Sequence, residues 1–172
     1  MNLKELKKKI PDIFERVKRD VKKVLNRRRA GLNLAFVNMG MSSRGFIGGM
    51  FFSGGTMIIM NNKALEVLLR EIKKDPDQQE DIALDYVYHV LMHEYLHSLG
   101  FLDEKSCRDI TLFVTKKLGY PKNHPVRQMA EKGIGVYFPN MVYAPEHYNF
   151  KPNPAHLELI PGFDKSNTIY YM

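Results

Sequence analysis

The chain has 172 residues, 44% of them hydrophobic and 26% charged, a composition typical of a globular protein with a sizeable core. No apolar run approaches the roughly 20 residues of a membrane-spanning helix, which argues against an integral membrane protein. The N-terminal segment has no apolar stretch and no small-residue cleavage site, so we expect no secretory signal. The only cysteine, Cys107, excludes an internal disulfide and is compatible with a reducing compartment. We therefore expect a cytoplasmic protein.

The net charge of +7 is concentrated at the N-terminus. Residues 1–30 contain twelve lysines and arginines against four acidic residues, a net +8, whereas the other 142 residues carry 14 against 15, a net −1. Such a segment is typical of nucleic-acid or anionic-surface binding, but a solvated helix face is the commoner explanation.

Periodicity in the first third of the chain predicts one helix followed by strands. Apolar residues at helical spacing indicate a helix over 11–28, with Pro11 in its first turn and Gly31 ending it. Alternation predicts a strand over 32–38. Two more strands, 46–52 and 56–61, flank the Ser53-Gly54-Gly55 turn. The glycines in 46–52 favour an edge strand or a local sheet distortion.

The period then returns to helical. Residues 62–74 indicate a short helix, and Asp75 with Pro76 and Gln78 predicts the start of a longer one that ends at about Leu99. Gly100 is then the expected left-handed residue after its end. A further helix is predicted over about 104–118, and the rest is rich in Pro, Asn and Tyr. One domain, 1–172, follows, with a basic helix (1–30), a sheet plus the long helix (31–100) and a helical or irregular C-terminal part (101–172).

The long helix carries the sequence His-Glu-x-x-His. His93 and His97 lie one turn apart on one face, so both imidazoles can reach a single metal ion. Glu94, on the adjoining side, is placed to take a proton from a metal-bound water. With the His and Glu content of this chain, such a match arises by accident on the order of once per hundred chains. This sequence is the zincin motif, and Zn²⁺ is the expected metal.

The residues that follow extend the motif to H-E-x-x-H-x-x-G-x-x-D. In this form the chain resembles the metzincin clan of zinc metallopeptidases, including the snapalysin-type members that use Asp as third ligand. The resemblance implies that Asp103 completes a His93, His97, Asp103 zinc site. It also implies an α/β (α+β) fold in which a small twisted mixed sheet, mostly parallel with one antiparallel edge strand, packs with the active-site helix and the C-terminal part.

The clan has a second mark, a tight turn with methionine beneath the metal and a tyrosine two residues later. Met141 and Tyr143 in "FPNMVYAPEHY" match it, and the resemblance implies that Met141 forms the floor of the site and that Tyr143 donates to the oxyanion. Met129 is the competing methionine, in a more helical context.

Other residues remain open as the third ligand. Glu104 is the nearest rival, although we expect it to point elsewhere on the turn; His124, His147 and His156 have no motif. Glu131 would serve in a gluzincin-like site, in which a downstream helix supplies the ligand. His89 lies one turn before His93 and is expected to be a core or supporting residue, because His89 and His97 are about 12 Å apart along the helix axis. Cys107 is expected to be buried.

These features predict a zinc-dependent metallopeptidase acting on a protein or peptide, with Glu94 as general base. An extended substrate is expected to add to the edge strand near 46–52. The alternative is a basic nucleic-acid-binding or interaction protein with a structural or vestigial zinc. An open fourth position favours catalysis, because structural zinc usually has four protein ligands.

Overall fold

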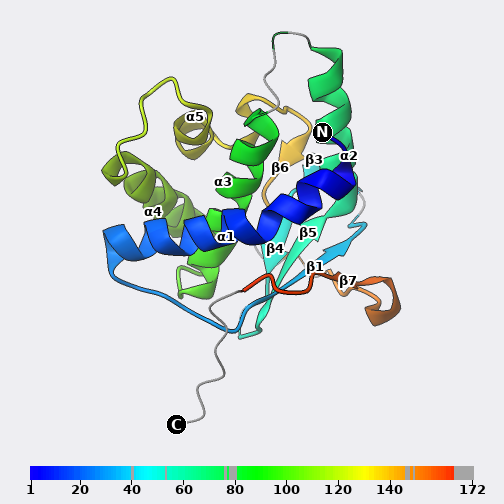
Figure 1. The fold of residues 1–172 in the computed structure, drawn as a ribbon, viewed down its shortest axis with the longest axis horizontal. Coiled ribbons are helices and arrows are strands. Elements are labelled where there is room, and N and C mark those ends of the chain that lie inside the picture. Colours follow the sequence, from blue (N-terminus) through cyan, green and yellow to red (C-terminus); the bar gives the residue numbers. More distant parts are fainter. Residues whose placement is uncertain are drawn as a thin grey trace.

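A computed structural model describes residues 1–39, 41–52, 54–75, 77, 81–145, 148 and 150–164. Within these residues the protein is a mixed α/β fold with five α-helices and two small sheets (Figure 1). None of the described helices is both long and apolar enough to cross a bilayer.

The N-terminal helix α1 spans Leu3–Leu25 and begins eight residues before the predicted start. The Asn2 side chain accepts from the backbone N–H of Glu5, and the Glu5 carboxylate accepts from the N–H of Asn2, a reciprocal capping box. Pro11 therefore lies inside the helix, and its expected place in the first turn was wrong.

The larger sheet has the strand order β4-β5-β1-β7. Strands β1 (Asn33–Val37) and β5 (Met57–Asn61) are parallel neighbours, which confirms the predicted strands 32–38 and 56–61. Both outer strands, β4 (Gly49–Phe51) and β7 (Glu158–Leu159), run antiparallel to their neighbours. The sheet is mixed as expected, but the expectation that it is mostly parallel with one antiparallel edge strand was wrong: in the described residues only β1 and β5 are parallel, and the strand at each edge is antiparallel.

The predicted strand 46–52 is two strands in different sheets. β3 (Gly45–Ile47) pairs with β2 (Met41–Ser42) and with β6 (Met141–Val142), whereas β4 is the edge of the larger sheet. The chain passes from one sheet to the other at Gly48, where a Cβ atom would lie 2.5 Å from the Tyr86 hydroxyl. The edge position is confirmed, and the close approach of Tyr86 explains why glycine interrupts the pattern.

Four more helices follow. These are α2 (Asn62–Lys74), α3 (Asp81–Ser98), α4 (Glu104–Lys117) and α5 (Pro125–Lys132), with short 3₁₀ turns η1 (Ile134–Val136) and η2 (Pro154–His156). Asp75 caps the end of α2, and the expectation that it starts the next helix was wrong. Pro76 and Gln78, which belonged to that predicted start, lie outside the described residues.

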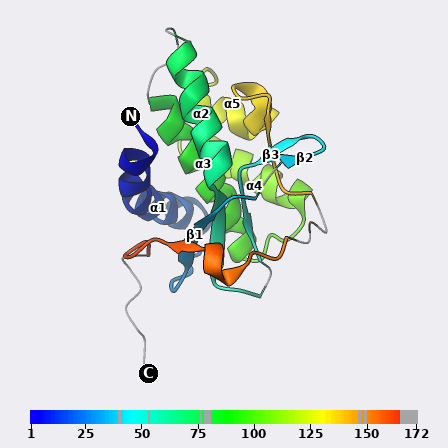
Figure 2. The same cartoon turned by 90° about the vertical axis from the view of Figure 1, so that its right-hand side faces the viewer.

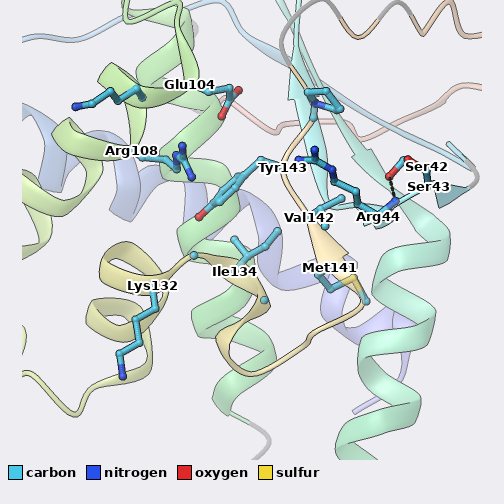
Figure 3. A pocket seen from close by; sticks show the side chains of 15 residues that line it. Ser42, Ser43, Arg44, Glu104, Arg108, Lys132, Ile134, Met141, Val142 and Tyr143 are labelled. Carbon is cyan, nitrogen blue, oxygen red and sulfur yellow. Dashed lines mark hydrogen bonds between the residues drawn. The ribbon is translucent and has the colours of Figure 1, made fainter.

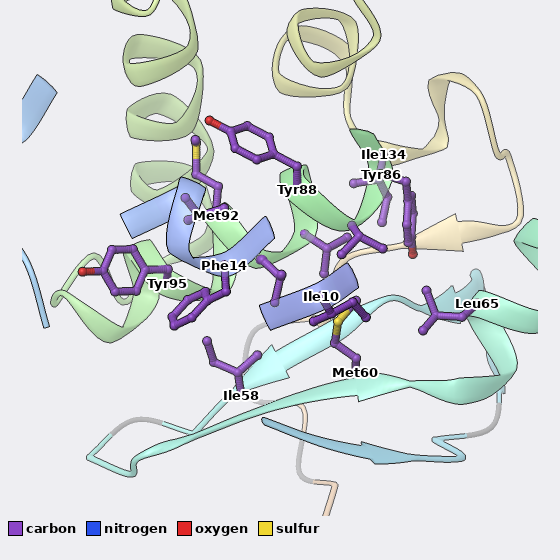
Figure 4. Packing of buried hydrophobic residues seen from close by; sticks show 14 of the residues in the cluster. Ile10, Phe14, Ile58, Met60, Leu65, Tyr86, Tyr88, Met92, Tyr95 and Ile134 are labelled. Atoms are coloured by element: carbon purple, nitrogen blue, oxygen red, sulfur yellow. The ribbon is translucent and has the colours of Figure 1, made fainter. Parts of the chain in front are cut away.

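The two faces of the larger sheet are buried by different parts of the chain. On one face, alternate strand residues such as Phe36 and Met60 lie in one core cluster with Ile10 and Phe14 of α1 and Tyr95 of α3. Figure 4 shows Met60 beside these helix residues. The opposite face packs against the C-terminal segment through Ala35, Ile59, Tyr148, Phe150 and Leu157. Figure 2 shows α2 and α3 above the sheet and this orange segment below it. Helix α3 is thus buried all round, so its side chains are held in fixed surroundings.

Candidate metal centre

The last turns of α3 hold the three residues of the predicted motif. His93, Glu94 and His97 are 1%, 5% and 8% exposed. The His93 and His97 rings meet edge to face at a centroid distance of 4.8 Å, and their Nε2 atoms are 3.2 Å apart. The helical spacing therefore brings the two imidazoles together as the sequence predicts.

Glu104, the first residue of α4, completes this group. Its Oε2 lies 3.0 Å from His93 Nε2 and its Oε1 lies 2.9 Å from His97 Nε2. Ligand atoms held about 2.0–2.1 Å from a tetrahedral zinc ion are about 3.3 Å from one another, so these spacings match a slightly contracted three-ligand site. The expectation that Glu104 points elsewhere was wrong.

Asp103 does not approach the histidine pair through any contact in the described structure. It is the N-cap of α4, and its Oδ1 accepts a hydrogen bond of 2.8 Å from the backbone N–H of Ser106. Hydrogen bonds from the Ser106 hydroxyl and from this N–H lower the pKa of the exposed carboxyl. A helix start needs such an acceptor, and the aspartate side chain supplies it. The residue expected to bind zinc thus orients the helix that presents Glu104.

The second nitrogen of each imidazole has its own partner. His97 Nδ1 lies 2.7 Å from the carbonyl oxygen of Phe101, and Gly100 has the positive φ of 108° that was predicted for the residue after the helix. His93 Nδ1 lies 3.6 Å from the sulfur of Cys107. A proton on Nδ1 leaves the Nε2 lone pair directed at Glu104, the tautomer that a metal ligand requires.

The carboxylate of Glu104 and the ring of His97 shift each other's pKa values. Burial alone would raise the pKa of Glu104, but hydrogen bonds from His93 and His97 lower it to about 2. Burial likewise disfavours a charged His97, yet the hydrogen bond to Glu104 and the nearby carboxylate of Glu94 raise its pKa overall. With neutral rings, two nitrogen lone pairs and a carboxylate would converge, so the group requires a proton or a metal cation between its members.

Cys107 is a second candidate for the third ligand beside His93 and His97. One ligand atom from each of His93, His97 and Cys107 lies within 4.8 Å of the others, so this buried trio could also hold a metal ion. The thiol lies on the Nδ1 side of His93 and its sulfur is 3.1 Å from the His93 carbonyl oxygen. Burial raises the pKa of the thiol, which disfavours the thiolate that binds metal. The Nε2 atoms face Glu104, which makes Glu104 the better-placed third ligand.

Glu94 lies between the histidine pair and the edge strand β4. Burial raises the pKa of its carboxyl, while the charges of His93 and His97 and a hydrogen bond from the backbone N–H of Phe51 oppose the shift. Across the strand, a Cβ atom at Gly49 would lie 3.7 Å from the Glu94 Cγ. The edge strand therefore runs directly beside this carboxylate.

Tyr143 packs against α3. Its ring stacks on His93 with centroids 4.5 Å apart, and its hydroxyl lies 2.6 Å from His89 Nε2. Burial raises the pKa of this phenol. His89 is a buried residue that supports the site, as the sequence predicts. The predicted role of Tyr143 toward an oxyanion stays a prediction, since its hydroxyl is paired with His89.

Met141 is buried at the start of β6, where it pairs with Phe46. It lines the same pocket as Glu104, but its side chain points away from Glu104 (Figure 3). Its proposed place beneath a metal therefore has no support from a described contact. Met129, the competitor, is buried in α5.

The other candidate ligands that the structure describes have no contact with the histidine pair. His124 caps α5, His156 is in the exposed turn η2, and Glu131 lies on α5 near Arg127. His147 is outside the described residues.

The basic N-terminal segment also contacts helix α3. Arg27 donates to the carbonyl of Leu99 at 2.7 Å, and Arg29 donates to the carbonyl of Ser98 at 2.9 Å. These carbonyls lie at the C-terminal end of α3, where a guanidinium satisfies free acceptors and interacts well with the helix dipole. Part of the N-terminal charge thus stabilises the helix end that carries His97, a role that the sequence did not indicate.

Comparison of the chain with protein-family models, with curated proteins and with solved structures finds no match.

Proposed function

We propose that the protein is a zinc-dependent metallopeptidase of zincin type, with His93, His97 and Glu104 as metal ligands and Glu94 as general base. The observation that carries the proposal is the convergence of two Nε2 atoms and one carboxylate within 3.2 Å of one another. Two histidines and a glutamate form a known ligand set of catalytic zinc, which leaves a fourth position for water or substrate. The metzincin resemblance is weaker than the zincin motif, because it depended on Asp103.

The donor set fits zinc in chemistry as well as in spacing. Imidazole nitrogen suits Zn²⁺, and each ring is oriented by a partner on its Nδ1 atom, Phe101 for His97 and Cys107 for His93. The carboxylate brings one negative charge to a buried site, where it compensates part of the charge of a divalent ion.

Zinc in such a site would lower the pKa of water to about 7 and polarise a peptide carbonyl. Glu94 would take the proton of the attacking water and deliver it to the leaving amine as the C–N bond breaks. Its raised pKa makes the ionised carboxylate a stronger base toward the attacking water. The backbone of β4 beside Glu94 would align an extended substrate through main-chain hydrogen bonds.

The alternative, a nucleic-acid-binding protein with a structural zinc, is supported by the exposed basic side chains of α1. These include Lys4, Lys8, Lys9, Arg19, Lys22 and Lys23. Arg27 and Arg29, by contrast, hold the end of α3, so the segment also has an internal structural task. In this alternative the metal site is structural and does not contact the nucleic acid.

The decisive experiment measures metal content and hydrolysis together. We expect about one zinc per chain by elemental analysis, and cleavage of an unstructured protein such as casein that chelation stops and zinc restores. Glu94→Gln should keep the zinc and lose hydrolysis by roughly 10²–10⁴-fold. Arg70→Ala, an exposed substitution on α2, is the control that keeps both. Zinc without any hydrolysis in the native protein would refute the peptidase proposal.

The same preparation distinguishes the two possible third ligands. Cobalt substituted for zinc gives a thiolate-to-metal charge-transfer band only if Cys107 binds it. We expect no such band, and an unchanged cobalt spectrum in Cys107→Ser. A charge-transfer band that Cys107→Ser removes would assign the site to His93, His97 and Cys107 and exclude Glu104 as the third ligand.

A further inference from the structure

A pocket of about 690 Å³ opens beside Glu104. Its walls come from the β2–β3 turn, the start of α4, the end of α5 and residues 141–145 (Figure 3). Two of its lining residues belong to the candidate metal centre: Glu104 contacts both histidines, and Tyr143 stacks on His93. A substrate bond held at the metal centre would therefore place a neighbouring substrate group in this pocket.

The pocket is strongly basic. Among the residues that the structure describes, Arg44, Lys105, Arg108 and Lys132 line it, Glu104 is the one acidic lining residue, and the other lining residues are uncharged. This concentration is local, because residues 31–172 together carry a net charge of −1. We call these four residues the basic pocket.

The two arginines of the basic pocket both extend toward Tyr143. Figure 3 shows Arg44 extending from the β2–β3 turn toward Tyr143, and the Arg108 guanidinium lies 6.0 Å from the centroid of the same ring. Lys132 points away from Glu104 at the rim (Figure 3). In the described part of the chain neither arginine has an acidic partner within salt-bridge distance, whereas Lys105 pairs with Asp109 at 2.7 Å. Two guanidinium groups are thus available to an incoming anion.

The chemistry of this arrangement selects one class of group. Guanidinium presents a planar fork of N–H donors that matches a carboxylate with two parallel hydrogen bonds. Apolar surface from Ile134 and Val142 completes the walls and suits the aliphatic part of a side chain. A substrate lysine or arginine would meet like charges and be disfavoured.

We infer that the basic pocket selects substrates that carry a carboxylate next to the bond to be cleaved. The carboxylate is that of an Asp or Glu side chain or that of the chain terminus, and Arg44 and Arg108 bind it. The inference rests on the proposed function, which supplies the bond that is cleaved.

The first test compares matched peptides cleaved by the zinc-loaded protein. One pair differs only in Glu or Gln beside the cleavage point, and a second pair differs only in a free or amidated C-terminus. We expect kcat/KM to favour one carboxylate form by about tenfold or more at low salt, and the pair that shows the preference identifies the source. Raising the salt concentration should reduce it, since the guanidinium groups are exposed. Equal kcat/KM within both pairs would overturn the inference.

Variants then connect the preference to the residues. Arg44→Ala and Arg108→Ala should each reduce the acid-to-amide ratio of kcat/KM by roughly three- to tenfold. Arg44→Glu should reverse the charge preference, so that a peptide with Lys beside the cleavage point is cleaved better than the Glu peptide. The exposed Arg70→Ala on α2 removes the same charge away from the pocket and should keep the ratio. A ratio that responds equally to Arg70→Ala and Arg44→Ala would contradict the inference.

A binding measurement separates this inference from the proposed function. Zinc-loaded Glu94→Gln is titrated with the same labelled peptides, and fluorescence anisotropy reports affinity without turnover. If the carboxylate forms bind more tightly than the amide forms, and Arg44→Ala abolishes this difference, the inference about the pocket is supported. That holds even if the native protein cleaves nothing, and then only the peptidase proposal fails. Binding that does not distinguish carboxylate from amide would overturn the pocket while leaving any hydrolysis in place.

Discussion

His89 and His97 lie two turns apart on the same buried helix, but the partner of His89 is neutral and the partner of His97 is charged. The ring of His89 meets the neutral hydroxyl of Tyr143, and burial together with the charge of His93 lowers its pKa from 6.5 to about 3. The ring of His97 meets the carboxylate of Glu104, and its pKa is raised despite burial. The helix places both side chains, but their neighbours on other elements decide which one is suited to a cation.

This difference separates a supporting histidine from a metal ligand more sharply than burial does, since both are buried. A neutral phenol next to His89 satisfies one ring nitrogen and offers no charge to hold a metal. A carboxylate shared by His93 and His97 creates a site that attracts a cation.

The largest expected effect is on zinc affinity, when the histidines that face Glu104 are substituted and compared with a substitution of His89. His93→Ala or His97→Ala should release zinc, with an affinity loss of about a thousandfold or more, because the remaining ligands cannot hold the ion in a buried site. His89→Gln, on the same helix face, should keep zinc within roughly tenfold. Chelator competition measures all three affinities, and a zinc loss in His89→Gln equal to that in His97→Ala would remove the distinction.

Glu104 and Asp103 are adjacent carboxylates at the start of α4, and only Glu104 faces the histidines. Substituting each of them tests which one binds the metal. Glu104→Gln should weaken zinc binding by roughly ten- to a hundredfold, because it removes the charge that both imidazoles face. Asp103→Asn keeps the capping oxygen and should leave the affinity unchanged. If instead Asp103→Asn releases zinc and Glu104→Gln does not, the ligand set implied by the metzincin resemblance is restored.

Titration of His89 provides a prediction in pH. The folded pKa of about 3 lies below the ordinary 6.5, so between these values the unfolded chain binds a proton that the folded chain does not. Stability from this group is therefore complete above pH 6.5 and is lost as pH falls toward 3, by about 2 kcal/mol at pH 5. Urea unfolding of metal-free protein at pH 7 and pH 5 should show a smaller loss for His89→Gln than for the native chain, and equal losses would refute the assignment.

The last prediction concerns the partner of His89. Tyr143→Phe removes the hydroxyl 2.6 Å from His89 Nε2 and keeps the ring that stacks on His93, so it should cost about 1–3 kcal/mol of stability. Because the stacked ring remains, zinc affinity should change little. Denaturant unfolding combined with metal titration checks both; a large zinc loss with unchanged stability would assign the hydroxyl to the metal site instead.

Some of these features are readable from the chain. Sequence patterns that extend over only a few residues predict the α3 spacing of His93 and His97, the positive φ at Gly100, helix α2, and strands β1 and β5. The place of Asp103 was also available: a helix predicted to begin at 104 makes residue 103 its cap, so its carboxylate is needed by the helix backbone. Helix α1 is longer than its apolar periodicity predicts, because the capping box of Asn2 and Glu5 starts it eight residues earlier.

The sequence by itself determined which helix carries the histidines and which residue types could bind a metal, because helical periodicity and capping are local. Only the tertiary structure decided that Glu104 faces both rings, that Gly48 divides a strand between two sheets, and that Arg44 and Arg108 line one pocket together with Tyr143. These contacts join elements distant in sequence, or depend on the angle at which α4 leaves the Gly100 turn. Packing of α4 against α3 and α5 sets that angle, and no periodicity in the chain encodes it.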